Sequence, residues 1–399
     1  MLFSHCSYAQ SNCDCPASRE FCSNADISSL LEMLEAIGDP RRARGKQHPL
    51  TFVLAVCVVA ALAGAKGYSE IARKARDMTE SLLGKLGAEW DWFRSRYKCP
   101  SKWTIRLVLS GIDGDHMDRV TGSWLAAQSA ANMEGQWNIS VDGKVMRGAW
   151  TTENEQVTLF SAMIREEGIT VAQVRVPDGT NETTRASSLL ESMPVPESDP
   201  AVFTLDAAHT QKETAEAIRK RPGWHYIMTV KGNQPTLQRA AFDAVLPFLR
   251  GEAHDIMEDR SRGKRKTWSC WTADAGGIDF PGAAQAAIII REVFEVSGDR
   301  IGKEMVLLLT SADANGMSAA TLNRHKRSHW GIENMSHYPR DTVYREDHNQ
   351  TWTGDGPQVL ASIHSLAMGL IRLKGINKIK ESTEWVAGDR TRALQFMAT

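Results

Sequence analysis

The stretch from Trp137 to Val230 constrains the fold more than any other part of this 399-residue chain. Its apolar residues first recur at every second position, which predicts strands, and later alternate between helix spacing and strand spacing. The predicted elements are, in order, strands at 137–145, 156–165 and 170–176, a helix at 186–193, a strand at 201–206, a helix at 211–220 and a strand at 224–230. This order predicts a mixed sheet covered by helices.

Two aspartates occupy strand positions in this segment. Asp142 lies in the first predicted strand, on the face opposite Val141, and Asp206 is the last residue of the apolar strand 201–206. A short, fully apolar strand is typical of a parallel strand that is buried on both faces. Because ligands collect at the carboxyl ends of strands in open α/β sheets, we expect the two aspartates to lie side by side. The element order matches a ribonuclease H-like fold, which is an α/β mixed-sheet architecture.

A third carboxylate, Glu333, lies in a later helical pattern. Lys326, His329, His337 and Arg340 recur around it at intervals of three or four residues, which places all five on one face of a helix. A carboxylate flanked by basic groups suits a metal-bound phosphate. The alternative interpretation is a solvated face of ion pairs.

Asp142, Asp206 and Glu333 together would form an oxygen-rich site, which suits Mg²⁺ or Mn²⁺ rather than zinc. Sites of this kind support two-metal phosphodiester chemistry, in which one ion activates the nucleophile and the other the leaving oxygen. The alternative is that these are unrelated surface acids among the 48 Asp and Glu residues. For any one acid taken alone that alternative is favoured, whereas the three together favour a metal site.

Pattern and composition divide the chain into four regions. The segments 254–258, 266–271, 286–293 and 305–310 predict strands inside an insertion. The predicted regions are a disordered leader at 1–26, a helical N-terminal domain at 27–130, an α/β domain that carries the three carboxylates at 135–375 with a β-rich insertion at about 232–316, and a C-terminal tail at 376–399.

The run 50–65 carries no charged residue, yet it is shorter than the roughly 20 residues that a membrane span requires. It therefore predicts a buried helix. The N-terminus lacks a charged segment followed by an apolar core, so no secretory signal is expected. Isolated Cys57, Cys99 and Cys270 fit a reducing compartment, and we expect a cytoplasmic protein.

Any contact with nucleic acid must use local basic patches, because the net charge is −1. One patch contains Arg262, Lys264 and Arg265 in the insertion. Arg106 lies in a predicted helix at 101–109, which follows another amphipathic segment beginning at Tyr68. These two helices predict either a helix-turn-helix, with the second helix available for a major groove, or a simple helical bundle. The sequence leaves both alternatives open.

Four motifs resemble one known family. They are Asp142-Gly-Lys144, Asp206 with His209-Thr-Gln211, Val230-Lys-Gly-Asn-Gln-Pro-Thr-Leu237 and His329-Trp-Gly-Ile-Glu-Asn334. As a set they resemble the insertion-sequence DDE transposases that include the H-repeat-associated proteins. The resemblance covers roughly residues 28–375. In many relatives from the wider superfamily, Tyr and Arg stand where this chain has Lys326 and His329.

The resemblance implies a ribonuclease H-like catalytic core that depends on Mg²⁺, with Mn²⁺ as a substitute, and that cuts and rejoins the ends of a DNA element. It implies Asp142, Asp206 and Glu333 as the catalytic triad. Lys144, Lys231, Lys326, His329 and Arg340 are the expected phosphate neighbours, and Arg106, Arg262, Lys264 and Arg265 the expected further DNA contacts.

The implied partners are double-stranded DNA, as terminal inverted repeats and as target, and a second copy of the chain in a homodimer on that DNA. The helical region 27–130 would bind the DNA ends, and the protein would associate with the bacterial nucleoid. Two other functions stay open: a catalytically inactive or repurposed DNA-binding regulator, and a nuclease that cuts without joining. The presence of all three acids favours the enzyme.

Overall fold

A computed structural model describes residues 26–42, 46–131, 135–150, 156–176, 182–349 and 353–398. Residues 1–25 of the expected leader lie outside these ranges. The helices are α2 (Ser28–Glu35), α3 (Leu50–Leu62), α4 (Tyr68–Arg76), α5 (Glu80–Lys85), α6 (Lys102–Gly111), α7 (Gly114–Ala130), α8 (Glu182–Glu191), α9 (Lys212–Arg219), α10 (Pro235–Val245), α11 (Ala319–His329), α12 (Tyr338–Thr342), α13 (Gly356–Leu373), α14 (Ile379–Gly388) and α15 (Ala393–Met397).

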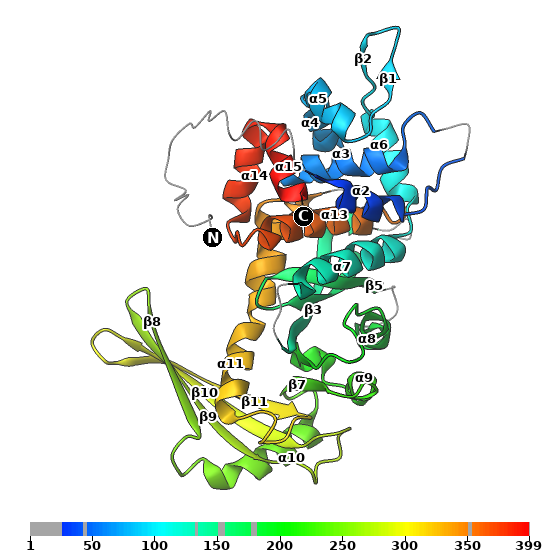
Figure 1. Cartoon of the computed structure of the whole chain (residues 1–399). Coiled ribbons are helices and arrows are strands. Elements are labelled where there is room, and N and C mark those ends of the chain that lie inside the picture. The colour runs from blue at the N-terminus through cyan, green and yellow to red at the C-terminus, as the bar shows by residue number, and fades with distance from the viewer. Residues whose placement is uncertain are drawn as a thin grey trace.

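The strands form a small hairpin and one large sheet (Figure 1). The hairpin pairs β1 (Trp90–Asp91) with β2 (Arg96–Tyr97). The strands of the large sheet are β3 (Trp137–Trp150), β4 (Gln156–Ile164), β5 (Ile169–Val176), β6 (Ala201–Leu205), β7 (Trp224–Val230), β8 (Asp255–Ser261), β9 (Lys264–Asp274), β10 (Gln285–Glu295) and β11 (Arg300–Thr310). Their order across the sheet is β5-β4-β3-β6-β7-β11-β10-β9-β8.

The sheet is mixed, as the sequence predicts. β3, β4 and β5 pair antiparallel, whereas β6 and β7 run parallel to β3. The strands expected between 232 and 316 are also present, and β11 pairs with β7, so these strands continue the same sheet. Helix α10, which begins at Pro235, was not among the predicted elements. Proline is favoured at the first position of a helix, where its missing N–H costs nothing.

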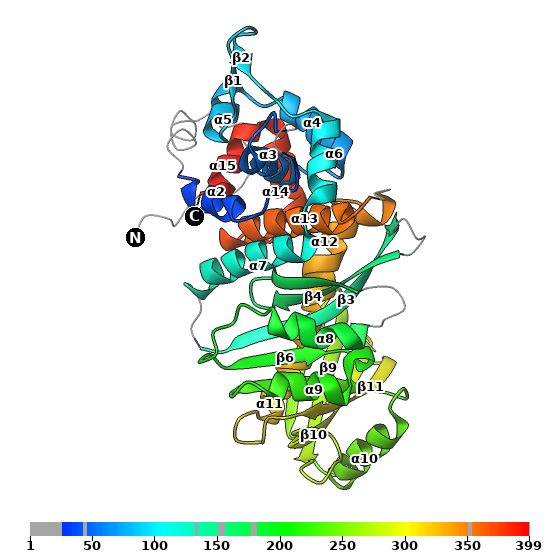
Figure 2. The ribbon, with the colours of Figure 1, turned by 90° about the vertical axis from the view of Figure 1, so that its right-hand side faces the viewer.

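Helix α3 is apolar on every side and is buried, which confirms the prediction for this segment. It is enclosed by α2, α4, α6, α13 and α14, so helices from both ends of the chain surround it (Figure 2). Helices α4 and α6 are in contact, but α5 and the β1–β2 hairpin separate them in the chain. A helix-turn-helix joins its two helices by three or four residues, so the bundle alternative holds for this pair.

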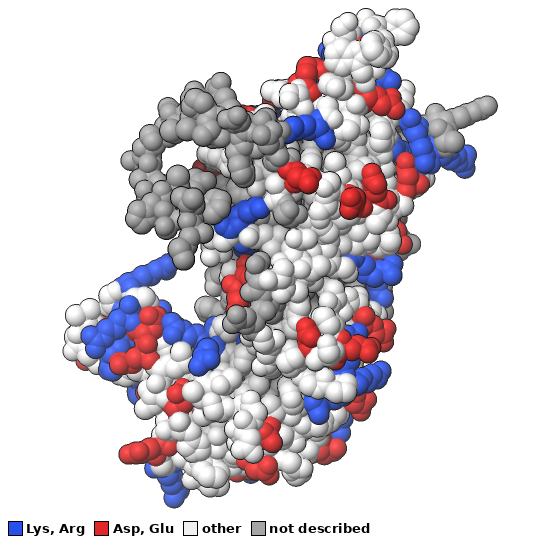
Figure 3. All heavy atoms as spheres, in the orientation of Figure 1, with Lys and Arg blue, Asp and Glu red and all other residues white. Residues whose placement is uncertain are grey.

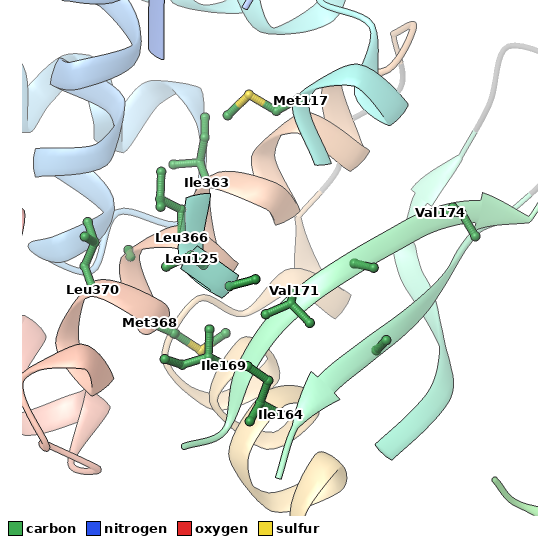
Figure 4. Packing of buried hydrophobic residues seen from close by; sticks show 14 of the residues in the cluster. Met117, Leu125, Ile164, Ile169, Val171, Val174, Ile363, Leu366, Met368 and Leu370 are labelled. Carbon is green, nitrogen blue, oxygen red and sulfur yellow. The ribbon is translucent and has the colours of Figure 1, made fainter. Parts of the chain in front are cut away.

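Helices α7 and α13 cover β5 and connect the sheet to the surrounding helices. Figure 4 shows Met117 and Leu125 of α7 beside Ile363, Leu366 and Leu370 of α13, with Ile169 and Val171 of β5 below them. Gly122 lets α7 approach the strand, since a Cβ at this position would stand 2.1 Å from the backbone oxygen of Val171. None of the helices in the described ranges has the length and apolar character needed to cross a membrane.

A buried ion pair joins α12 to the rest of the molecule. The guanidinium of Arg340 donates to the Glu346 carboxylate at 2.7 Å, and the two side chains are 0% and 1% exposed. Glu346 also contacts Nδ1 of His364 at 2.9 Å, and the second ring nitrogen of His364 lies 3.1 Å from the Ala65 carbonyl oxygen. Arg340 further donates to the Gln173 amide oxygen of β5 at 3.3 Å. This network connects α12, β5, α13 and the loop before α4.

We predict that Arg340→Ala destabilises the fold strongly, because it leaves the Glu346 charge buried without its partner. Removing one member of such a pair costs about 3–5 kcal/mol. Urea unfolding of Arg300→Ala is the matched control, since Arg300 contacts Glu292 at 2.6 Å with 51% and 24% of the side chains exposed. Exposed pairs contribute about 0–1 kcal/mol. Equal losses in the two variants would contradict the prediction.

The same network predicts how stability depends on pH. Burial raises the pKa of Glu346, but Arg340 and His364 outweigh it and hold the pKa at about 2, below its ordinary value of 4.5. A carboxylate with a depressed pKa stabilises the fold above its unfolded-state pKa and loses this contribution as the pH falls towards its folded-state pKa. The difference in unfolding free energy between wild type and Glu346→Gln should therefore shrink between pH 5 and pH 2.5. A constant difference would refute this assignment.

Candidate metal centre

Asp142 is positioned by the pleat of β3. Val141 is buried in the core, and Asp142 points to the opposite face with an intermediate exposure. Val141 is paired with Leu205 of β6 in parallel register. Asp142 inside β3 and Asp206, which follows β6, each come one residue after this pair, so they lie at the same level on neighbouring strands.

Glu333 and His337 lie in a π-helical turn, Glu333–His337, between α11 and α12. Single π-turns inside α-helices are uncommon and are found frequently at functional sites. This turn directs both residues towards Asp142. One ligand atom from each of Asp142, Glu333 and His337 lies within 4.8 Å of the other two. Nε2 of His337 is 4.0 Å from Oδ2 of Asp142.

The His337 imidazole is suited to binding a cation. Burial lowers its pKa to about 3, and the charges of Arg340 and Lys144 act in the same direction, so the ring is neutral at physiological pH. Its Nε2 atom is buried and has no hydrogen-bond partner among the described residues. A neutral imidazole beside two carboxylates provides the nitrogen and oxygen donors that Mn²⁺ and related divalent ions accept. The residues present therefore fit a divalent metal.

Asp206 lies outside this group of three, although it was expected within it. Its Oδ1 atom is 3.4 Å from Nζ of Lys231. Burial raises its pKa, but the backbone N–H of Ala207 and the charges of Lys231 and Lys326 outweigh this effect, so its pKa is lowered. His337 was not expected as a ligand. The spacing of four residues from Glu333 was the signal in the sequence that could have identified it.

Two basic residues of α11 contact the neighbouring strands β6 and β7. Lys326 donates from Nζ to the Thr229 hydroxyl at 2.9 Å, and burial lowers its pKa. Nδ1 of His329 lies 2.9 Å from the Thr204 hydroxyl, and burial together with the Lys326 charge lowers its pKa to about 3. These side chains fasten α11 to β6 and β7, next to the candidate site.

The other basic residues expected near phosphate have different surroundings. Lys144 is almost fully buried, and its Nζ lies 2.6 Å from Asp341 and 3.6 Å from Asp347. Arg340 is fully buried in its pair with Glu346, so a phosphate contact would require it to leave that pair. Lys231, by contrast, is 62% exposed. Of these three residues it has the most access to solvent.

The remaining expected DNA contacts lie on other parts of the molecule. Arg106 of α6 is exposed, donates to the Thr353 hydroxyl at 3.1 Å and stacks over Trp103. Arg262, Lys264 and Arg265 lie at the turn between β8 and β9 and line a hollow of about 340 Å³. Lys and Arg side chains gather with some carboxylates on the ribbon that β8 to β11 form (Figures 1 and 3).

Most of the chain matches a known family of proteins. Residues 136–370 match the family described as Transposase DDE domain, and residues 31–125 match its associated domain, described as DDE_Tnp_1-associated. The chain therefore belongs to the DDE transposase family. Two of its relatives carry the name "H repeat-associated putative transposase".

Two of these relatives extend over most of the chain. The protein named "Putative transposase YncI" from Escherichia coli O157:H7 is 26% identical over 357 residues, which cover 87% of this chain and 88% of the relative. The H repeat-associated protein YhhI of Escherichia coli K12 is 24% identical over 360 residues, or 87% and 91% of the two chains. Among solved structures, a piggyBac transposase synaptic complex with hairpin DNA aligns with 95% of this chain and 78% of that chain, at a TM-score of 0.39 and 10% identity.

We predict that Mn²⁺ raises the melting temperature of the protein, because binding to the folded state alone stabilises it by about 2.7 kcal/mol at a hundredfold excess over Kd. Asp142→Asn, Glu333→Gln and His337→Ala should each reduce this shift. Asp206→Asn should reduce it less than these three variants do, since Asp206 lies outside the group of three. Thermal melts with and without Mn²⁺ check this. A full shift in His337→Ala would remove His337 from the set of ligands.

Proposed function

We propose that this member of the DDE transposase family cleaves a phosphodiester at the end of an insertion sequence and joins the released 3′-hydroxyl to target DNA. The observation that carries the proposal is the convergence of Asp142, Glu333 and His337 inside the segment that matches the DDE domain. The strand order β5-β4-β3-β6-β7, with three antiparallel strands followed by two parallel ones, supports a ribonuclease H-like core.

The cofactor we propose is Mg²⁺ or Mn²⁺, held by Asp142, Glu333 and His337, with Asp206 available for a second ion. A bound divalent cation would activate water, polarise the phosphodiester and stabilise the charge that develops on the leaving oxygen. A nitrogen ligand is better suited to Mn²⁺ than to Mg²⁺. We therefore expect Mn²⁺ to support activity at least as well as Mg²⁺.

The reaction needs no nucleophile from the protein. In cleavage, a water oxygen attacks the phosphorus and the bond to the 3′ oxygen breaks, which leaves a 3′-hydroxyl and a 5′-phosphate. In joining, that 3′ oxygen attacks a target phosphorus and displaces another 3′ oxygen. Lys231 neutralises the phosphate, because its exposed ammonium can move from Asp206 to the DNA. Once Lys231 has moved, an oxygen of Asp206 is available for the second ion.

Three further assignments belong to the proposal. The region 27–130 binds the DNA ends, the chain acts as a homodimer on double-stranded DNA, and the β8–β9 turn with Arg262 and Lys264 touches the DNA backbone. The basic residues at that turn support the last assignment. Lys326 and His329 act by positioning α11 on β6 and β7.

We predict that Asp206→Ala and Glu333→Gln each lower Mg²⁺-dependent strand cleavage by more than about 100-fold, which corresponds to roughly 2.7 kcal/mol of barrier height. The assay uses a labelled duplex that carries the inverted repeat of the element. Asp279→Ala is the matched control, because this acid is 97% exposed and pairs only with Lys212 among the described residues. Strand cleavage at the wild-type rate in either acid variant would contradict the assignment of that acid to the catalytic site.

Binding to the same duplex, measured beside cleavage, separates the enzyme from a repurposed regulator. Specific binding by pure wild-type protein without Mg²⁺- or Mn²⁺-dependent nicking would favour the regulator. Nicking without joined products would favour a nuclease. The proposal requires both cut and joined strands.

A further inference from the structure

A second basic site lies between the helices near the N-terminus and the loop that follows α12. A cavity of about 550 Å³ opens there beside the start of α4, the first turns of α6 and the short helix Glu346–His348. Its lining brings together residues that are far apart in the sequence. The charged and histidine side chains among them are Lys66, Glu70, Lys102, Arg106, Arg345 and His348.

The charge in this cavity is unbalanced. Lys66, Lys102, Arg106 and Arg345 have no ion-pair partner within the described part of the chain. The Arg106 guanidinium donates to Thr353 and lies over the Trp103 ring. The single carboxylate, Glu70, already accepts the backbone N–H of Lys66 at 3.0 Å and lies 3.9 Å from Arg73. Four cations that share one hollow repel each other, and an anion would relieve this repulsion.

The walls of the cavity are fixed by contacts of their own. Asn349 donates from its amide to the Lys66 carbonyl oxygen at 2.7 Å, which joins the loop after α12 to the loop before α4. Arg345 has a left-handed backbone with φ of 52°, a conformation that is uncommon for residues other than glycine. Residues in such conformations cluster at ligand sites, where the surrounding structure holds them. The next residue, Glu346, is held by the buried ion pair with Arg340.

Helix α4 contributes to the same hollow. It begins at Tyr68 after the extended residue Gly67, and Gly67, Tyr68 and Ser69 line the cavity. The first turn of a helix presents N–H groups without partners in the helix and carries partial positive charge, and both features favour a phosphate group. Here the helix start adds to four cationic side chains.

We propose that this cavity binds a backbone phosphate of DNA, at a position distinct from the candidate metal centre. The proposal rests on the proposed function only in taking DNA as the partner. Arg345 and His348 follow directly after α12, and Asp347 between them contacts Lys144, two residues from Asp142. A phosphate bound here is therefore held at a fixed distance from the metal centre, and it sets which phosphodiester is presented for cleavage.

The test is the salt dependence of duplex binding by the full-length chain. Each phosphate contact adds about 0.9 to the slope of log Kd against log salt. The double variant Lys102→Gln/Arg345→Asn removes two cations, and asparagine tolerates the left-handed backbone. We expect its Kd to rise and its slope to fall by about 1, because one phosphate contact is lost. Lys378→Gln/Lys380→Gln at the start of α14 is the control with the same charge change, because these lysines are 72% and 77% exposed, and it should keep the wild-type slope.

Four measurements decide the outcome: the salt slope of duplex binding, the thermal shift with phosphate, the thermal shift with Mn²⁺, and nicking of the duplex. An unchanged slope in the double variant overturns the proposal. A thermal shift that inorganic phosphate gives to wild type but not to the variant, together with unchanged duplex binding, assigns the cavity to free phosphate instead and also overturns it. A reduced slope with the Mn²⁺-induced thermal shift intact supports it. If wild-type protein shows this slope but never nicks DNA, the proposed function fails while the phosphate site stands.

Discussion

The charge of Glu346 is the constraint on which the rest of the structure depends. It is buried, and it is balanced by Arg340 at 2.7 Å and by His364 at 2.9 Å. An unbalanced charge in the interior lowers the stability of the fold by several kcal/mol. The contacts of Glu346 with Arg340 and with His364 must therefore form together. They hold α12, and with it the π-turn that carries Glu333 and His337, at one position against the sheet and α13. The candidate metal centre is thus shaped by a network that does not contain any of its ligands.

Local patterns were sufficient to predict the strands β3 to β7 and the strand positions of Asp142 and Asp206, because strands and strand positions both follow from the periodicity of apolar residues. The alternation in β3 places Asp142 opposite the buried Val141, and the apolar run of β6 ends at Asp206. The π-turn could not be predicted in this way, since its sequence is compatible with an ordinary α-helix and only contacts with distant segments decide between the two. For that reason His337 was missed as a partner of Asp142.

The environment of the basic residues could not be predicted either. Lys326, His329, His337 and Arg340 were expected on one face of a helix, whereas they are distributed over α11, the π-turn and α12. Their surroundings are supplied by Thr229, Thr204, Asp142 and Glu346. No pattern within a helix indicates whether an arginine faces solvent or a buried carboxylate. The same limit applies to the cavity beside α4 and α6, because its two walls are separated by more than 200 residues of sequence.

The enclosure of α3 affects the order in which the chain can fold. Helix α13 covers one side of α3, and His364 of α13 reaches the Ala65 carbonyl oxygen across 299 residues. At a synthesis rate of about 5–20 residues per second, α3 waits roughly 15–60 s for that partner. During this time α2, α4 and α6 can already pack against α3, but the apolar side that α13 and α14 cover stays open. The last step in enclosing α3 therefore follows the synthesis of α13 and α14.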